Sequence, residues 1–285
     1  MSSLEETKYI LKKYNIKANK KLGQNFLIDD NVIENIIIAA GVTEEDLIIE
    51  IGPGLGTLTS KLLEKAGRVI AVELDENMLK ILQDRFKLYN NIQLINEDIL
   101  KINLKELITS NLNNLKNVKI VANLPYYITT PIIMKLLEDR LNIESITVMV
   151  QKEVADRITA VPGDKLSGAI TYSVNYYSTT EKVVLVGKEC FIPSPEVDSE
   201  VIKLNIRKEP PVKVENEEIF FKIIKASFMQ RRKTLANSLT NAGIIKDKES
   251  ANRIFDKMNL KPDIRGEKLT IEEFAKLADL ITKGI

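Results

Sequence analysis

The tetrapeptide Asn123-Leu124-Pro125-Tyr126 could do chemistry on an aromatic base that carries an amine. It follows the apolar run Val118–Ala122, which predicts a buried strand that ends at a tight turn. At such a turn the Asn123 side-chain oxygen and a backbone carbonyl can each accept one hydrogen of an adenine amine. The nitrogen lone pair then becomes available, and the Tyr126 ring can hold the base by stacking. These are the parts that methylation of an adenine amine needs, although Asn and Pro are also common in ordinary turns.

A glycine-rich turn earlier in the chain is where an α/β protein binds a nucleotide-like cofactor. The apolar run Leu47–Ile51, with Glu50 near its end, leads into Gly52-Pro53-Gly54-Leu55-Gly56. Glu73 ends the next apolar run, 21 residues after Gly52, where a carboxylate can accept hydrogen bonds from ribose hydroxyls. Asp98 follows a third run and could accept from an adenine amine. This set lacks the Gly-x-Gly-x-x-Gly pattern and fits S-adenosylmethionine better than NAD.

The composition excludes several classes of chemistry. The 285 residues contain no His, no Trp and a single cysteine, Cys190. Without His, both Ser-His-Asp and Cys-His nucleophiles are excluded, as are His acid–base catalysis and His metal sites. One Cys also excludes an intrachain disulfide and a Cys-based metal cluster, so we expect no metal. Chemistry then depends on Asn, Asp, Glu, Tyr, Lys and backbone groups, which suits a cofactor that carries its own reactive group.

Length and hydropathy favour a cytoplasmic protein with no membrane partner. Hydrophobic residues make up 44% of the chain and charged residues 28%, which is ordinary for a soluble globular protein. No apolar run approaches the ~20 residues of a membrane span. The polar, Lys-rich start of the chain predicts no signal peptide. A single Cys agrees with a reducing cytoplasm, and we expect a monomer.

The charge is unevenly spread, although the net charge is only +1. From residue 205 to the C-terminus, 17 Lys and Arg residues stand against 12 Asp and Glu residues, a local charge of +5. The first 21 residues hold a second, Lys-rich cluster. Such asymmetry favours a nucleic-acid partner, and Arg231, Arg232 and Lys233 are candidates for phosphate contacts. A solvated helix start is the alternative interpretation of these three cations.

Two regions of different periodicity must position these residues. Up to residue 206, short apolar runs alternate with helical patterns, which predicts an α/β fold with a parallel sheet. Beyond a linker at residues 207–211 the pattern is helical only. The last two strands are expected to form an antiparallel hairpin at the sheet edge. The predicted strands are Leu47–Ile51, Arg68–Glu73, Ile92–Asn96, Val118–Ala122, Ser145–Gln151, Lys182–Val186 and Glu200–Ile206.

Six motifs, in this order, give the chain a close resemblance to a known family. They are Lys21-Leu22-Gly23-Gln24-Asn25-Phe26-Leu27, Glu50-Ile51-Gly52-Pro53-Gly54-Leu55-Gly56, Val72-Glu73-Leu74-Asp75, Asn123-Leu124-Pro125-Tyr126-Tyr127-Ile128, Phe191-Ile192-Pro193-Ser194-Pro195-Glu196-Val197-Asp198-Ser199 and Arg231-Arg232-Lys233-Thr234-Leu235. Together they resemble the motifs of the KsgA (RsmA) family of small-subunit ribosomal RNA adenine dimethyltransferases. The resemblance extends from about residue 20 to the C-terminus.

This resemblance implies an architecture and an activity. Residues 1–207 would form a Rossmann-like, S-adenosylmethionine-dependent methyltransferase domain, with residues 1–29 as a basic N-terminal segment and loop. Residues 208–285 would form a small all-helical domain that contacts the ribosome. The implied reaction places two methyl groups on each of two adjacent adenosines in the 3′-terminal hairpin loop of 16S rRNA. The substrate would be the small subunit or its late assembly precursor, with a role in ribosome biogenesis.

The resemblance also assigns roles to individual residues. The tetrapeptide 123–126 would be the catalytic turn, with Tyr126 and Phe191 as the two aromatic walls that clamp the target base. Arg231, Arg232 and Lys233 would contact RNA. The expected cofactor contacts are Asn25, Leu27, Gly52, Glu73, Asp98 and Asn123.

Three other functions remain open from the sequence. A sister enzyme that methylates large-subunit ribosomal RNA and confers macrolide resistance would share the fold, the cofactor and the Asn-x-Pro-Tyr turn. An NAD-dependent oxidoreductase would share the fold, but the glycine spacing and the absence of His count against it. A non-catalytic ribosome-assembly or RNA-binding factor would need no cofactor set.

Overall fold

The computed structural model describes residues 2–19, 22–230 and 232–284 of the chain. Contacts divide the chain into two compact units. Unit 1 consists of residues 1–155 and 180–206, and unit 2 of residues 156–179 and 207–285. This division differs from the expected one because residues 156–179, which were expected in the first domain, belong by their contacts to unit 2. The expected domain boundary after residue 207 and the ribosome contact of the second domain stay predictions.

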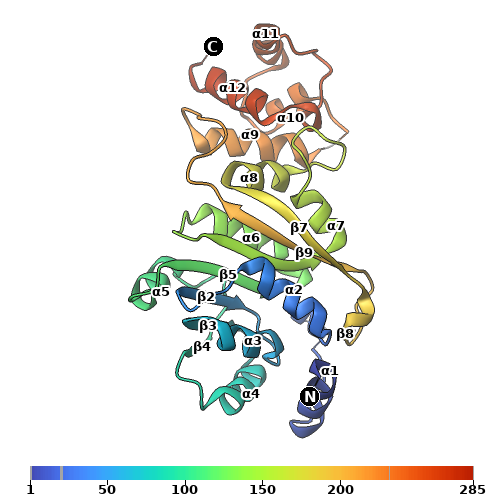
Figure 1. The fold of residues 1–285 in the computed structure, drawn as a ribbon. Coiled ribbons are helices and arrows are strands. Elements are labelled where there is room, and N and C mark those ends of the chain that lie inside the picture. The colour runs from blue at the N-terminus through green and yellow to red at the C-terminus, as the bar shows by residue number, and fades with distance from the viewer. Residues whose placement is uncertain (1, 20–21, 231, 285) are drawn as a thin grey trace. The chain divides into compact units, whose positions relative to one another are not determined.

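The described part of unit 1 contains a seven-stranded sheet with the strand order β4-β3-β2-β5-β6-β9-β7 (Figure 1). β2 pairs in parallel with β3 and β5, β3 with β4, and β5 with β6. β9 pairs antiparallel with β6, and β7 lies beside β9 at the edge. Every predicted strand is therefore present. Their bounds are β2 (Asp46–Ile51), β3 (Arg68–Glu73), β4 (Ile92–Asn96), β5 (Asn117–Asn123), β6 (Ser145–Gln151), β7 (Ser178–Val186) and β9 (Ser199–Ile206).

Helices follow or precede the strands of this sheet. The first of them is α1 (Ser3–Lys13). It lies in the N-terminal segment for which the sequence predicted a basic charge but no helix. The short strands β1 (Phe26–Leu27) and β8 (Phe191–Ile192) pair antiparallel away from the main sheet. The other helices are α2 (Asp30–Ala40), α3 (Thr57–Lys65), α4 (Glu76–Phe86), α5 (Leu104–Asn111), α6 (Thr129–Glu138) and α7 (Lys152–Ile158), with short 3₁₀ turns η2 (Tyr126–Ile128) and η3 (Lys188–Cys190).

Helix α2 shows how local sequence and packing act together. Asp29 caps its N-terminus by accepting hydrogen bonds from the backbone of Asn31 and Val32, at 2.9 and 3.1 Å. Gly41 ends it in a left-handed conformation, at φ 58°. The buried residues recur at helical spacing and pack with α3 against β2, β3, β5, β6 and β9: they are Val32, Ile33, Ile36, Ile37 and Ala40. One apolar face thus fixes α2 against the sheet.

Unit 2 has a core of its own, in which aromatic side chains pack among aliphatic ones. Tyr172 is fully buried, and its hydroxyl donates to the Leu269 carbonyl at 2.5 Å and accepts from the Gly163 backbone at 2.9 Å. Phe274 packs edge-on against the Tyr172 ring, with 5.0 Å between ring centroids. The helices are α8 (Ala169–Tyr177), α9 (Glu217–Met229), α10 (Leu235–Asn241), α11 (Lys248–Met258) and α12 (Ile271–Thr282), with the 3₁₀ turn η4 (Gly266–Lys268). None of the helices among the described residues has the length and apolarity that a membrane crossing requires.

A buried ion pair holds the amino ends of β2 and β5 together. The Asp46 side chain is 0% exposed and that of Lys119 is 5% exposed, and Lys119 Nζ donates to the carboxylate at 2.8 Å. The carboxylate also accepts from the Thr43 backbone at 2.8 Å and from the Asn117 amide at 3.0 Å. Lys119 Nζ makes a further hydrogen bond to the Gly41 carbonyl at 2.7 Å. Both charges are therefore compensated by several partners, which a buried pair needs.

We expect Lys119→Ala to destabilise unit 1 strongly, because it leaves the Asp46 carboxylate buried without its cation. The free energy of unfolding should fall by about 3–5 kcal/mol. Urea unfolding followed by far-ultraviolet circular dichroism measures this change. Lys61→Ala is the matched control, since Lys61 and Glu64 form an exposed pair at 3.1 Å, and it should change stability by less than about 1 kcal/mol. Equal effects of the two variants would contradict the prediction.

Candidate active site

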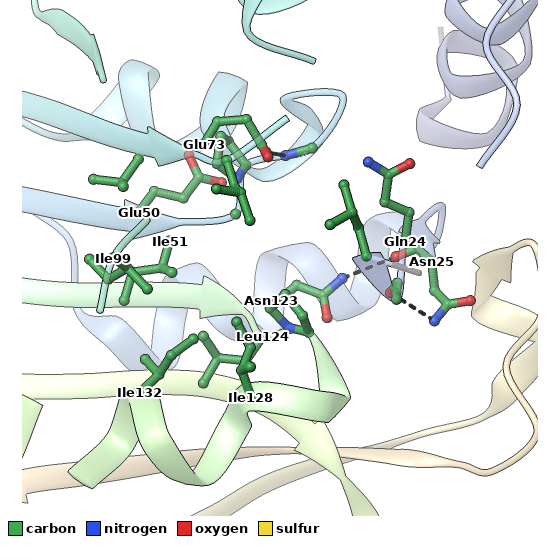
Figure 2. A pocket seen from close by; sticks show the side chains of 18 of the residues that line it. Gln24, Asn25, Glu50, Ile51, Glu73, Ile99, Asn123, Leu124, Ile128 and Ile132 are labelled. Carbon is green, nitrogen blue, oxygen red and sulfur yellow. Dashed lines mark hydrogen bonds between the residues drawn. The ribbon is translucent and has the colours of Figure 1, made fainter. Parts of the chain in front are cut away.

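A pocket opens at the carboxyl ends of β2, β3 and β5 (Figure 2). In parallel sheets the carboxyl ends of neighbouring strands meet at one edge, where α/β proteins bind ligands. The pocket wall is formed by segments that are far apart in the sequence. The lining residues are 22–27 before and in β1, 50–55, 57 and 58 around the glycine turn, 72–74 at the end of β3, 97–99 after β4, and 123–128 and 132 at the end of β5 and beyond.

The glycine turn can take its shape only with glycine at its last position. Gly56 has a φ of 82°, which side chains rarely adopt. A Cβ placed there would lie 2.6 Å from Phe86 Cε2 and 2.8 Å from Leu82 Cδ2, both on α4. The glycine therefore lets α4 pack closely against the turn that borders the pocket.

Glu73 holds the glycine turn from the neighbouring strand. Its Oε2 accepts from the Gly54 backbone at 3.1 Å, and its Oε1 accepts from the Asp75 backbone at 2.8 Å. Burial raises the pKa of Glu73 above its ordinary value. Each carboxylate oxygen keeps a second lone pair, so the side chain can still accept hydrogen bonds from a ligand in the pocket.

Glu50 is a buried carboxyl group on the pocket floor. It is 1% exposed, and its Oε2 has no hydrogen-bond partner within the described structure. Burial raises the pKa of Glu50 to about 8. A buried polar atom without a partner at a pocket wall fits a site that binds a polar or cationic ligand.

The Asn123 side chain is oriented by a backbone carbonyl across the pocket mouth. Its Nδ2 donates to the Asn25 carbonyl at 3.3 Å, as the dashed line in Figure 2 shows. The amide nitrogen is thus engaged, and the amide oxygen is left as an acceptor. The Leu124 backbone donates to the Met149 carbonyl at 3.1 Å, which fixes the start of the turn. The turn therefore presents a pre-oriented amide oxygen at the pocket.

The segment before β1 is held against the pocket by polar contacts. Gln24 Nε2 donates to Asp75 at 2.8 Å, and Gln24 Oε1 accepts from the Asn19 backbone at 2.8 Å. Asn25 Nδ2 donates to the Gly23 carbonyl at 3.3 Å. These contacts place the Asn25 carbonyl where it meets Asn123.

Family comparisons agree with the geometry of this pocket. The model of a family described as ribosomal RNA adenine dimethylase matches residues 15–282. The protein named ribosomal RNA small subunit methyltransferase A from Clostridium botulinum (strain Loch Maree / Type A3) is 50% identical over 275 residues, 96% of this chain and 98% of that one. Its namesake from Clostridioides difficile (strain 630) is 49% identical over 285 residues, 100% of this chain and 98% of that one. The chain belongs to this rRNA adenine dimethylase family.

Solved structures agree with the fold. The crystal structure of a dimethyladenosine transferase from Plasmodium falciparum has a TM-score of 0.75 at 27% identity, and the match covers 91% of this chain and 98% of that one. The 23S rRNA methyltransferase ErmE has a TM-score of 0.66 at 24% identity, with 90% and 100% covered. The second likeness concerns the fold alone. The predicted family and the predicted Rossmann-like α/β class with a helical C-terminal part are both confirmed.

The pocket of this chain brings together most of the residues that the sequence analysis singled out. Asn25 and Leu27, Gly52, Glu73, Asp98 and the tetrapeptide 123–126 all line it. Their individual roles stay predictions. The sequence did not single out Ile99 and Ile132, which add apolar wall, because an apolar residue after a strand or in a helix reads as core.

Two groups of predicted residues lie elsewhere. Phe191 does not line the pocket: it is 3% exposed and belongs to the core of unit 1, in the same buried cluster as Val186 and Val201. Through the pairing of β1 with β8 it lies opposite Leu27, which does line the pocket. Arg232 and Lys233 are exposed residues of unit 2, between α9 and α10, and Arg231 lies outside the described residues. Base stacking by Phe191 and RNA contact by the three cations stay predictions.

We expect Glu50→Gln to remove a pH dependence of stability. The pKa of Glu50 is raised from 4.5 to about 8. Between these two pH values the folded protein keeps a proton on Glu50 that the unfolded chain loses. The protonated Glu50 side chain therefore contributes to the free energy of unfolding. This contribution is fully present below about pH 4.5 and is lost as the pH rises through about 8. The slope is at most about 1.4 kcal/mol per pH unit, and Glu50→Gln should flatten it.

Urea unfolding between pH 5 and 9 measures this dependence. Glu64→Gln is the control, since the Glu64 side chain is 50% exposed and should leave the wild-type curve unchanged. Parallel curves for wild type and Glu50→Gln would contradict the raised pKa.

Proposed function

We propose that the chain dimethylates the exocyclic amines of two adjacent adenosines in the 3′-terminal hairpin loop of 16S rRNA, with S-adenosylmethionine as methyl donor. The observation that carries the proposal is the oriented amide of Asn123 at the mouth of the pocket. Full-length relatives at about half identity, named as small-subunit methyltransferases, support it over the large-subunit alternative. The substrate is the small subunit or its late precursor, and the site of action is the cytoplasm.

The residues around the glycine turn fit S-adenosylmethionine. The cofactor supplies a methyl group activated by a positively charged sulfur. Glu73 and Asp98 both line the pocket. In this proposal Glu73 accepts from the ribose hydroxyls and Asp98 from the adenine amine of the cofactor. Asn25, Leu27 and Gly52 complete the wall around it. The uncompensated carboxyl of Glu50 fits a ligand with positive charge nearby.

The turn at the end of β5 holds the target base. Asn123 Oδ1 and the Leu124 carbonyl accept the two amine hydrogens and aim the nitrogen lone pair into the pocket. Pro125 sets the backbone of the turn, and the Tyr126 ring supports the base by stacking, which contributes ~1–3 kcal/mol per base. None of these roles requires a covalent bond to the protein. The binding energy is therefore used for orientation and electrostatic preorganisation.

We expect Asn123→Ala to lower kcat for methyl transfer by at least about 100-fold, the size of effect seen when one preorganised polar group is removed. The assay uses labelled S-adenosylmethionine and small subunits that lack the modification, with nucleoside analysis of the product. Asn35→Ala is the matched control, because Asn35 is an exposed amide on α2. Wild-type transfer to large subunits alone would contradict the proposed substrate, and wild-type-like kinetics of Asn123→Ala would contradict the proposed turn.

We also expect Arg232→Ala and Lys233→Ala each to weaken small-subunit binding and to reduce the salt dependence of the binding constant by about one unit of slope. Each removes one exposed cation that is proposed to meet a phosphate. Binding titrations between 50 and 200 mM salt measure the slope. Lys105→Ala removes an exposed cation of unit 1 and should leave the slope as in wild type. Unchanged slopes for both unit 2 variants would contradict the RNA contact.

A further inference from the structure

The hydroxyl of Tyr126 is tied to a serine on a different strand. Tyr126 Oη lies 2.7 Å from Ser199 Oγ, in a hydrogen bond in which either oxygen can donate. Ser199 is 0% exposed, and Tyr126 is half-buried at the pocket wall. Water therefore cannot readily replace the serine hydroxyl, so Ser199 Oγ is the hydrogen-bond partner available to the Tyr126 hydroxyl.

Ser199 lies on backbone that cannot move easily. It is the first residue of β9 and pairs with Gln151, the last residue of β6, at the end of a continuous antiparallel register. The backbone carbonyl of the preceding residue, Asp198, accepts from the Lys152 backbone N–H at 3.0 Å. A hydroxyl on a paired strand is a fixed point, and groups on strands are held more rigidly than groups on loops.

The backbone around Tyr126 is fixed as well. The Pro125 carbonyl accepts from the Ile128 backbone at 3.2 Å and from Thr129 Oγ1 at 3.1 Å, which closes η2. The ring orientation is then set by the two side-chain torsions of Tyr126 alone. The neighbouring Tyr127 is 54% exposed, so its ring end faces solvent rather than a buried partner. The structure thus tethers one of two adjacent tyrosines, the one assigned to the target base.

We propose that Ser199 is a positioning residue for base binding: its hydroxyl anchors the far end of the Tyr126 ring on which the target adenine stacks. The inference rests on the proposed function, since stacking on Tyr126 is part of it. Ser199 touches neither base nor cofactor in this scheme. It acts through Tyr126, so its effect must disappear when the Tyr126 hydroxyl is absent.

A double-mutant cycle tests this dependence. Ser199→Ala and Tyr126→Phe remove the two ends of the same hydrogen bond, and each should raise KM for small subunits by about three- to tenfold, the effect of one hydrogen bond. The combined variant should be no worse than Tyr126→Phe alone. The Kd for S-adenosylhomocysteine, measured by calorimetry, should stay as in wild type. Additive effects in the combined variant, or a changed Kd with unchanged KM, would overturn the inference.

Ser145→Ala is the matched control, because Ser145 is the buried first residue of β6, at the other end of the β6–β9 pair, and should leave KM unchanged. If Ser199→Ala does not fold, Tyr126→Phe tests the same hydrogen bond by removing its other hydroxyl. A wild-type KM in Tyr126→Phe then overturns the inference. Wild type is assayed in parallel on the same small subunits. Absence of transfer by wild type overturns the proposed function, whereas active wild type with an unchanged KM in both variants overturns only the role of Ser199.

Discussion

Parallel pairing of β2 with β3 and β5 is the constraint on which the site depends. In-register pairing sets Glu50 beside Ala71 and Val121, and Ile51 beside Val72 and Ala122. The next residues along each strand are Gly52, Glu73 and Asn123. Three groups that are far apart in the sequence therefore arrive at one edge because their strands run in the same direction. A shift of one residue would turn the side chains of a strand to the opposite face and break up this set.

Two buried carboxyl groups of the sheet lie in different environments. At the amino end, Asp46 stays ionised because Lys119 and neighbouring donors compensate it at hydrogen-bonding distance. At the carboxyl end, no cation of the described residues pairs with Glu50, and burial raises its pKa to about 8. The first arrangement stabilises the fold, whereas the second leaves an uncompensated group at the pocket. Incomplete compensation of this kind is typical of functional sites.

The sequence predicted what depends on periodicity and on local motifs. Strand positions, the glycine turn and the tetrapeptide at residues 123–126 are local patterns, and the structure contains each of them. Phe191 could not be placed in the same way, because β8 has only two residues and gives no alternation that tells core from pocket. The grouping of residues 156–179 with unit 2 depends on contacts such as that of Tyr172 with Leu269, which no local pattern encodes. Ser199 was quoted only as the end of a motif, since its partner lies 73 residues away.

Helix α4 connects the glycine turn to the N-terminal segment. Phe86 packs where a Cβ at Gly56 would lie, and the guanidinium of the preceding Arg85 donates to the Leu55 carbonyl. The same guanidinium meets Glu6 of α1 at 2.6 Å, and its side chain is only 11% exposed. The turn is thus fixed from outside by a side chain whose charge is balanced by the first helix of the chain. Since a largely buried cation without its carboxylate is unfavourable, the ordering of α1 and the shape of the cofactor turn are coupled through Arg85. The basic N-terminal segment is therefore part of the structure that builds the pocket, in addition to any contact it makes with nucleic acid.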